Sequence, residues 1–262
     1  MLFRLGTPVL VIVIVVIVVG TTLGGVALGR RLESAHDAIR EPVGVVQAAL
    51  LGFVGLLLAF GLTMAVGRYE SRRGALVVEA NAIGTAFLRS ETIGEPQRSE
   101  SITLLRTYVD GRIRLAHLVV ETSAFGSEVD ASKELERALW KLAGQALVAS
   151  PDGTAVRLYV DSLNTMFDAG SSREAAYHDR IPLSVAYLQI GGSALALGVL
   201  GLYLATLGRR VLSAMLASVL VALILLVALD LDRPQRGLIT VPSRALASLQ
   251  QNMQQEPASA AP

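Results

Sequence analysis

The 262-residue chain contains no cysteine, which excludes a disulfide framework, a thiolate nucleophile and any cysteine metal site. Its three histidines, His36, His117 and His178, are scattered without the spacing of metal ligands or of a catalytic triad. No Walker sequence occurs, and the glycines of GTTLGG lie inside an apolar run rather than between a strand and a helix. We therefore expect no metal site and no cofactor.

Paired carboxylates are the catalytic arrangement that the sequence leaves open. Glu70 and Glu79, or Asp230 and Asp232, could converge in the fold. Salt bridges and solvated surfaces are the more common roles for such acids, and Asp230 and Asp232 mark the end of an apolar run, where water or lipid headgroups can solvate them. Without another constellation to support catalysis, we expect that the protein is not an enzyme.

Charge is also scarce, at 17% of residues against 52% hydrophobic. The net charge is +1, and residues 67–180 carry 14 basic against 16 acidic residues, so no electrostatic attraction to nucleic acid is expected. Arginine outnumbers lysine 21 to 2, a bias typical of GC-rich bacterial genomes.

The hydrophobic excess is concentrated in four blocks at the two ends of the chain, and each is long enough to cross about 30 Å of hydrocarbon as a helix. The blocks are residues 9–28, 43–66, 183–207 and 211–229. A cleaved signal peptide is the alternative interpretation of the first block, but its length and the absence of a cleavage site favour a span.

Four spans place both termini on the same side of the membrane. On that side nine arginines lie near span ends: Arg4, Arg68, Arg72, Arg73, Arg173, Arg180, Arg233, Arg236 and Arg244. The other side has five, in shorter loops and at higher density: Arg30, Arg31, Arg40, Arg209 and Arg210. The total favours termini in the cytosol, whereas the density weakens that assignment.

The second span carries two different faces at helical spacing. Small residues that permit close helix packing are Ala48, Gly52, Gly55 and Ala59. The other face consists of Phe53, Leu57, Phe60 and Met64. Contact with lipid or with the protein core is the simpler interpretation of this second face, and a hydrophobic pore constriction is the alternative. The amides of Gln47 and Gln189 are expected to face another helix or a cavity.

The polar middle of the chain continues the helical period, so the second span is expected to extend without a break to about Ile93. Three further amphipathic segments follow, separated by breaks at 94–96, 124–132 and 150–153. They predict a four-helix bundle. After the fourth span we expect one short helix capped by Ser243, and disorder in the last dozen residues.

The sequence therefore predicts an all-α protein with four transmembrane helices and a helical cytosolic bundle between spans two and three. We divide it into spans one and two (1–66), the bundle (67–180), the hairpin of spans three and four (181–232) and a C-terminal segment with a disordered tail (233–262).

Three stretches carry a family resemblance: GRYESRRGALVVEANAIGTAFLRSETI, YVDSLNTMFDAG and LDLDRPQRGLITV. Together with the two-span hairpin they closely resemble the bestrophin-like domain family of bacterial membrane proteins, which is distantly similar to the bestrophins, pentameric anion channels. Phe60 matches the end of the channel's second span. The motif positions are Arg68, Glu70, Arg73, Glu79, Asn81, Asp230, Asp232, Pro234 and Gly237.

The resemblance implies a homo-oligomeric anion channel in the bacterial inner membrane, with the termini and the bundle in the cytosol. Its implied partners are the lipid bilayer, further copies of the chain in a pentamer, and small anions. Gln235 stands where the pattern has Phe, and no acidic cluster follows Gly237, so a calcium clasp is not expected. A membrane-anchored helical sensor or scaffold without a pore is the alternative function.

Overall fold

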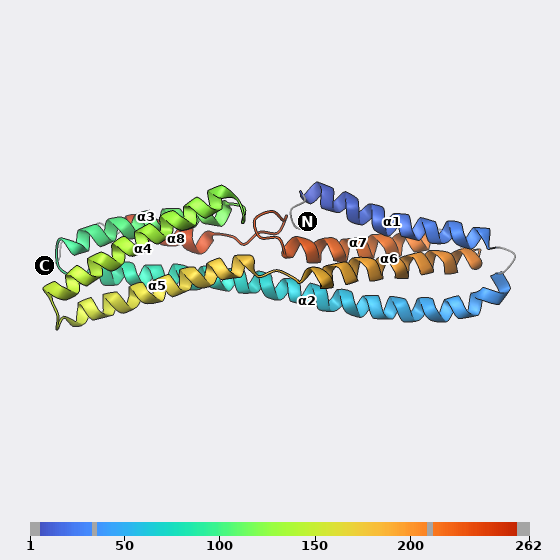
Figure 1. Ribbon diagram of the computed structural model, residues 1–262, viewed down its shortest axis with the longest axis horizontal. Helices are drawn as coiled ribbons and strands as arrows, with labels where there is room; N and C mark the ends of the chain where they lie inside the picture. The colour runs from blue at the N-terminus through green and yellow to red at the C-terminus, as the bar shows by residue number, and fades with distance from the viewer. Residues whose placement is uncertain (1–5, 33–35, 209–211, 256–262) are drawn as a thin grey trace. The chain divides into compact units, whose positions relative to one another are not determined.

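The structure is a computed structural model that describes residues 6–32, 36–208 and 212–255, and every regular element in these ranges is an α-helix (Figure 1). The expected all-α fold is confirmed. The helices are α1 (Thr7–Arg31), α2 (His36–Ser90), α3 (Gln97–His117), α4 (Ser123–Ala149), α5 (Thr154–His178), α6 (Leu183–Thr206), α7 (Leu212–Leu231) and α8 (Arg244–Gln255).

Four helical stretches are long and apolar enough to cross a membrane, and each overlaps one of the four apolar blocks. They are Thr7–Arg31, Arg40–Ser90, Thr154–Thr206 and Leu212–Leu231. The chain forms two compact units. Unit 1 contains residues 1–69 and 180–239, and unit 2 contains residues 70–179 and 240–262.

Helix α2 contributes residues to both units. It runs for 55 residues without interruption and ends at Ser90, three residues before the expected limit at Ile93. Pro42 lies inside the helix near its start, and no further proline occurs before Pro96, so every later residue of α2 has the backbone N–H that a continuous helix needs. The prediction that the apolar helix continues into the charged segment is confirmed.

Unit 1 packs α1, α6 and α7 against one another (Figure 1). Small residues permit the closest approach: a side chain at Gly25 would overlap the carbonyl oxygen of Gly198, and one at Gly201 would overlap that of Thr22. Close backbone contact is typical of helix association in lipid. Deeper in this core, the hydroxyls of Thr22 and Ser218 lie 2.7 Å apart and join α1 to α7 by a hydrogen bond.

We expect Gly25→Ala to destabilise unit 1 by about 1–3 kcal/mol, because the added methyl group forces α1 away from α6. The matched control is Gly24→Ala, since a side chain at Gly24 would meet nothing within 4 Å. Thermal unfolding of the purified protein in detergent measures both. Equal melting temperatures for the two variants would contradict the close packing of α1 on α6.

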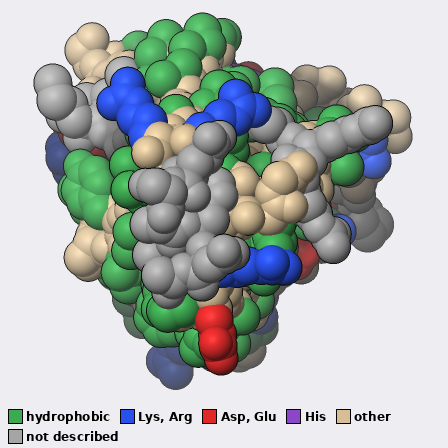
Figure 2. Space-filling view, turned by 90° about the vertical axis from the view of Figure 1, so that its right-hand side faces the viewer, with side chains coloured by type: hydrophobic (Ala, Val, Ile, Leu, Met, Phe, Trp, Pro, Cys, Tyr) green, Lys and Arg blue, Asp and Glu red, His purple; other side chains and the backbone are tan. Residues whose placement is uncertain are grey.

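Basic and apolar side chains are distributed differently on unit 1. Arg30 and Arg31 occupy the last turn of α1, and Arg40 is exposed near the start of α2. Figure 2 looks onto this end and shows basic side chains on the end face with hydrophobic side chains around them. Such a distribution is typical of helix ends at a membrane surface. Arg4, Arg209 and Arg210, which also entered the orientation count, lie outside the described residues.

Unit 2 is a helical bundle with one hydrophobic core. Helices α3, α4, α5 and α8 share this core with the last part of α2, through residues such as Ile83, Leu105, Leu139, Leu163 and Leu246. Helix α8 is fixed to α3 by two polar contacts: the guanidinium of Arg106 donates to the carbonyl oxygen of Met253 at 2.7 Å, and the amide of Gln250 donates to Asp110 at 2.6 Å.

Two expectations for this unit are wrong. The break expected at 124–132 lies inside α4, which begins at Ser123 after Thr122 caps it by accepting the N–H of Phe125. The expected disorder of the last dozen residues is also wrong for 251–255, which are helical; residues 256–262 lie outside the described residues. The short helix after the fourth span is confirmed, and the Ser243 hydroxyl lies 3.4 Å from Nε2 of His117.

Candidate functional site

The part of α2 in unit 1 has one face packed against its own chain. Val54, Leu58, Gly61 and Ala65 are buried at helical spacing. Gln189 of α6, itself buried, donates from Nε2 to the carbonyl oxygen of Leu57 at 3.0 Å. The expectation that the Gln189 amide faces another helix is therefore confirmed. The hydrogen bond joins α6 to α2.

The aromatic face of α2 points away from its own chain. Phe53 is 55% exposed and Phe60 is 60% exposed, with Met64 exposed and Leu57 half-buried between them. The structure thus brings the four candidate pore-lining residues into one line on an open surface. Contact with the core of this chain, one of the two simpler interpretations, does not hold for Phe53 and Phe60.

The small-residue face of α2 is a third, separate surface. Ala48, Gly52, Gly55 and Ala59 are exposed, and a side chain at Gly52 or Gly55 would meet nothing within 4 Å. Close packing of these residues against a helix of the same chain is not observed. Packing against another chain stays a prediction.

The motif residues that follow on α2 have contrasting environments. Glu70 and Arg73 are exposed and lie 4.0 Å apart as a surface pair. Asn81 is exposed, and its carbonyl oxygen accepts the hydroxyl of Thr85. Arg68 is half-buried, whereas Glu79 is completely buried in unit 2. Glu70 and Glu79 therefore do not form a carboxylate pair.

Glu79 is the centre of a buried ion-pair network. One carboxylate oxygen accepts Nε of Arg112 at 2.5 Å, and the other accepts Nη1 of Arg173. Arg112 also donates to Glu174 at 2.7 Å and to the carbonyl oxygen of Gly170. Both arginines are at most 1% exposed. Because Arg112 belongs to α3 and Arg173 to α5, Glu79 of α2 forms buried ion pairs with two other helices.

Tyrosines complete this network. The Arg112 guanidinium lies 5.7 Å from the ring centre of Tyr108, and Arg173 lies 5.4 Å from that of Tyr177, whose hydroxyl accepts Nε of Arg173. Burial raises the pKa of the Tyr108 hydroxyl above its ordinary value. Burial acts to lower the pKa of Arg112, but Glu79, Tyr108 and Glu174 together outweigh burial, so the pKa of Arg112 is raised.

The sequence contains a signal for this network that was not used. Arg112 follows Ile102, Leu105 and Val109 at spacings of 3, 4 and 3, and Arg173 likewise falls on the buried stripe of α5. A charged residue at a core position must find a buried partner. The pattern could therefore have identified Arg112 and Arg173 as members of a buried pair.

The acidic turn after α7 is built differently from the expectation. Asp230 is 7% exposed and accepts the N–H groups of Leu238 and Ile239, each at 2.9 Å. Asp232 is fully buried and accepts the N–H of Ile181 at 3.0 Å. Solvation by water or headgroups, as expected for these two acids, is wrong. Each carboxylate accepts hydrogen bonds from backbone N–H groups. The two aspartates therefore do not form the catalytic carboxylate pair that the sequence left open.

Gly237 and Pro234 belong to the same turn. The N–H of Gly237 donates to the carbonyl oxygen of Arg233, and a side chain at Gly237 would lie 2.7 Å from the carbonyl oxygen of Asp230. Pro234 is half-buried. The turn thus requires glycine at 237, because the chain folds back onto Asp230.

No group of three or more His, Asp or Glu side chains suited to a metal ion occurs among the described residues. His117 lies near Ser243, and the His178 ring meets Phe125 edge-on. The side chain of His36 lies outside the described part of the chain.

Comparison with known proteins gives one family and one fold. The family profile described as "Bestrophin-like domain" matches residues 12–246. Among solved structures, a bacterial bestrophin homologue from Klebsiella pneumoniae, phased by Zn-SAD, is 14% identical with a TM-score of 0.67, and the match covers 92% of this chain and 98% of that one. A crystal structure described as a membrane protein is 13% identical with a TM-score of 0.70, covering 93% and 99%. No curated protein matches the chain.

Proposed function

The chain belongs to the Bestrophin-like domain family, and on that premise we propose that it forms a homo-oligomeric channel for small anions in the bacterial inner membrane. The observation that carries the proposal is the geometry of α2. A single unbroken helix presents Phe53, Phe60 and Met64 on an open face, while a different face of the helix is held by α6.

Helix α2 has three faces that differ in side-chain size and burial, and each face fits a different neighbour in an oligomer. At about 100° per residue, the buried, aromatic and small-residue stripes point in three separate directions. The first contacts the same chain, and the second and third are unoccupied in it. In a ring of identical chains, the small residues Gly52 and Gly55 admit a neighbouring helix, and the aromatic stripe faces the axis. A pentamer is the assembly that the family resemblance suggests.

The same proposal assigns places to the parts of the chain. Residues 1–66 and 181–232 cross the membrane, and residues 67–180 form a cytosolic bundle continuous with α2. Both termini are cytosolic, with 233–262 as the C-terminal segment. The excess of arginines near the span ends on that side supports this orientation.

Anion flux through liposomes tests the function. We expect the purified, folded oligomer to release chloride from preloaded liposomes, with empty liposomes as the control. Absence of flux for several ions and pH values, from protein shown to be oligomeric and folded, would contradict the channel. It would favour a membrane-anchored sensor or scaffold instead.

A further inference from the structure

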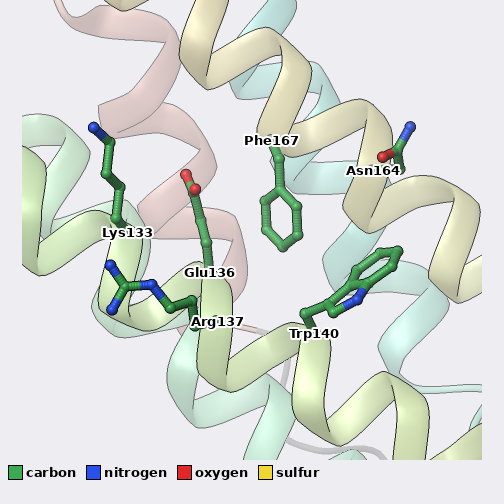
Figure 3. A pocket seen from close by; sticks show the side chains of 6 residues that line it. All are labelled: Lys133, Glu136, Arg137, Trp140, Asn164 and Phe167. Atoms are coloured by element: carbon green, nitrogen blue, oxygen red, sulfur yellow. The ribbon is translucent and has the colours of Figure 1, made fainter.

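A groove between α4 and α5 of unit 2 is not used by the proposed channel. Its volume is about 440 Å³, and it is lined by Lys133, Glu136, Arg137 and Trp140 of α4 and by Asn164 and Phe167 of α5 (Figure 3). Small-molecule sites in proteins have volumes of about 300–1,000 Å³. The groove is therefore large enough for a small organic ligand.

One side of the groove is aromatic. The rings of Trp140 and Phe167 have centres 6.1 Å apart and are tilted by 59°. Trp140 is 48% exposed and is the one tryptophan of the sequence. The faces of aromatic rings attract cations, and proteins hold organic ammonium groups against clustered aromatic side chains.

The acidic group of the groove is Glu136. In Figure 3 the Glu136 side chain extends from α4 toward α5, and the ring of Phe167 extends from α5 toward α4. One oxygen accepts the hydroxyl of Tyr108 at 2.9 Å, but Glu136 forms no ion pair with any residue that the structure describes. Burial raises the pKa of Glu136, and the Tyr108 hydroxyl and Arg112 oppose that rise. A partly buried carboxylate that has no ion-pair partner is stabilised by a cation that binds next to it from solution.

The basic residues of the rim do not make an anion site. Arg137 is paired with Glu134 at 2.5 Å, and both side chains are about 70% exposed. In Figure 3, Lys133 and Arg137 extend to the side of Glu136 that is opposite Trp140. An anionic ligand seated on the aromatic rings would therefore face the Glu136 carboxylate.

We propose that this groove binds a small organic ammonium compound, with its ammonium group on Glu136 and its apolar body against Trp140 and Phe167. This proposal does not depend on ion conduction. The groove is also connected to α2. Glu136 accepts the hydroxyl of Tyr108, the ring of Tyr108 lies against the Arg112 guanidinium, and Arg112 is bonded to Glu79 of α2. A cation bound to Glu136 therefore acts, through Tyr108, on the ion-pair network around Glu79.

Fluorescence of Trp140 tests the proposal directly, since no other tryptophan contributes. The full chain in detergent is titrated with phenethylammonium, 2-phenylethanol and phenylacetate, which share one apolar body and differ in the charge of the head. We expect a saturable change with phenethylammonium and affinities lower by about ten- to hundredfold for the other two, the equivalent of a charge-assisted hydrogen bond. Equal or tighter binding of phenylacetate, or no saturable change with phenethylammonium, would overturn the proposal.

Variants that retain Trp140 as the fluorescent reporter test whether the ammonium group binds at Glu136. Glu136→Gln keeps an acceptor for Tyr108 and should weaken phenethylammonium binding by about tenfold or more. Glu134→Gln, the matched control on the exposed side of α4, should change it by less than about threefold. Lys133→Ala should tighten binding because it removes a like charge. Unchanged affinity in Glu136→Gln, or weaker binding in Lys133→Ala, would refute the assignment, and unfolding curves confirm that each variant is folded.

Discussion

Glu79→Gln is expected to destabilise unit 2 by about 3–5 kcal/mol, the cost of removing one partner from a buried ion pair. The substitution leaves Arg112 and Arg173 in the core without the carboxylate that both contact. Thermal and urea unfolding of the full chain in detergent, followed by circular dichroism, should show a large loss of stability.

The control for this prediction lies on the same helix. Glu70→Gln removes a glutamate that is 58% exposed and pairs only loosely with Arg73. Its effect should stay within about 0.5 kcal/mol, as for other surface pairs. In addition, Arg173→Met placed on the Glu79→Gln background should restore part of the lost stability, because it removes one uncompensated buried charge. If the Glu70 and Glu79 variants lost similar amounts of unfolding free energy, the buried ion pairs of Glu79 would not be a main source of stability.

The contrast between Glu70 and Glu79 shows what the sequence could predict. Both occur in the family motif, and helical phase alone separates them: Leu76, Glu79 and Ile83 follow one buried stripe, and Glu70 lies outside it. A pattern on one helix therefore predicts burial. It does not identify Arg112 and Arg173 as the partners, because their positions depend on how α3 and α5 pack against α2.

The helix start at Ser123 shows a different limit. The polar composition of 124–132 favours a loop by propensity, yet serine, glycine and aspartate are also common in the first turns of a helix. The Thr122 cap and the buried ring of Phe125 fix the start of α4. Propensity located the polar stretch but could not distinguish a loop from the first turns of a capped helix.

Asp230 and Asp232 were expected to be solvated, but the structure buries both. Their partners are the backbone N–H groups of Leu238, Ile239 and Ile181. Any non-proline residue supplies such a donor, so no side-chain pattern reveals it. Glycine at 237 was the available sign of a chain folded back on itself. The apolar spans, by contrast, were predictable because length and composition alone identify them.

Phe60→Ala is expected to raise chloride flux severalfold if the oligomer conducts. Phe60 is 60% exposed on the aromatic face of α2, and a ring of these side chains would narrow the axis and disfavour water. Alanine widens and wets that ring. Because most of the Phe60 side chain is exposed in its own chain, the variant should retain the stability of the isolated chain to within about 1 kcal/mol. Liposome flux and thermal unfolding, measured on the same preparation, check both expectations.

Leu195→Ala separates a pore-lining position from one that faces lipid. Leu195 is 59% exposed on α6, so it matches Phe60 in exposure but lies on a helix that is not proposed to line the axis. If both side chains face lipid, the two truncations should leave flux unchanged. If α2 lines the pore, flux should rise in Phe60→Ala alone. Lower thermal stability of the oligomer in Phe60→Ala with wild-type flux would place Phe60 in a contact between chains and remove it from the pore.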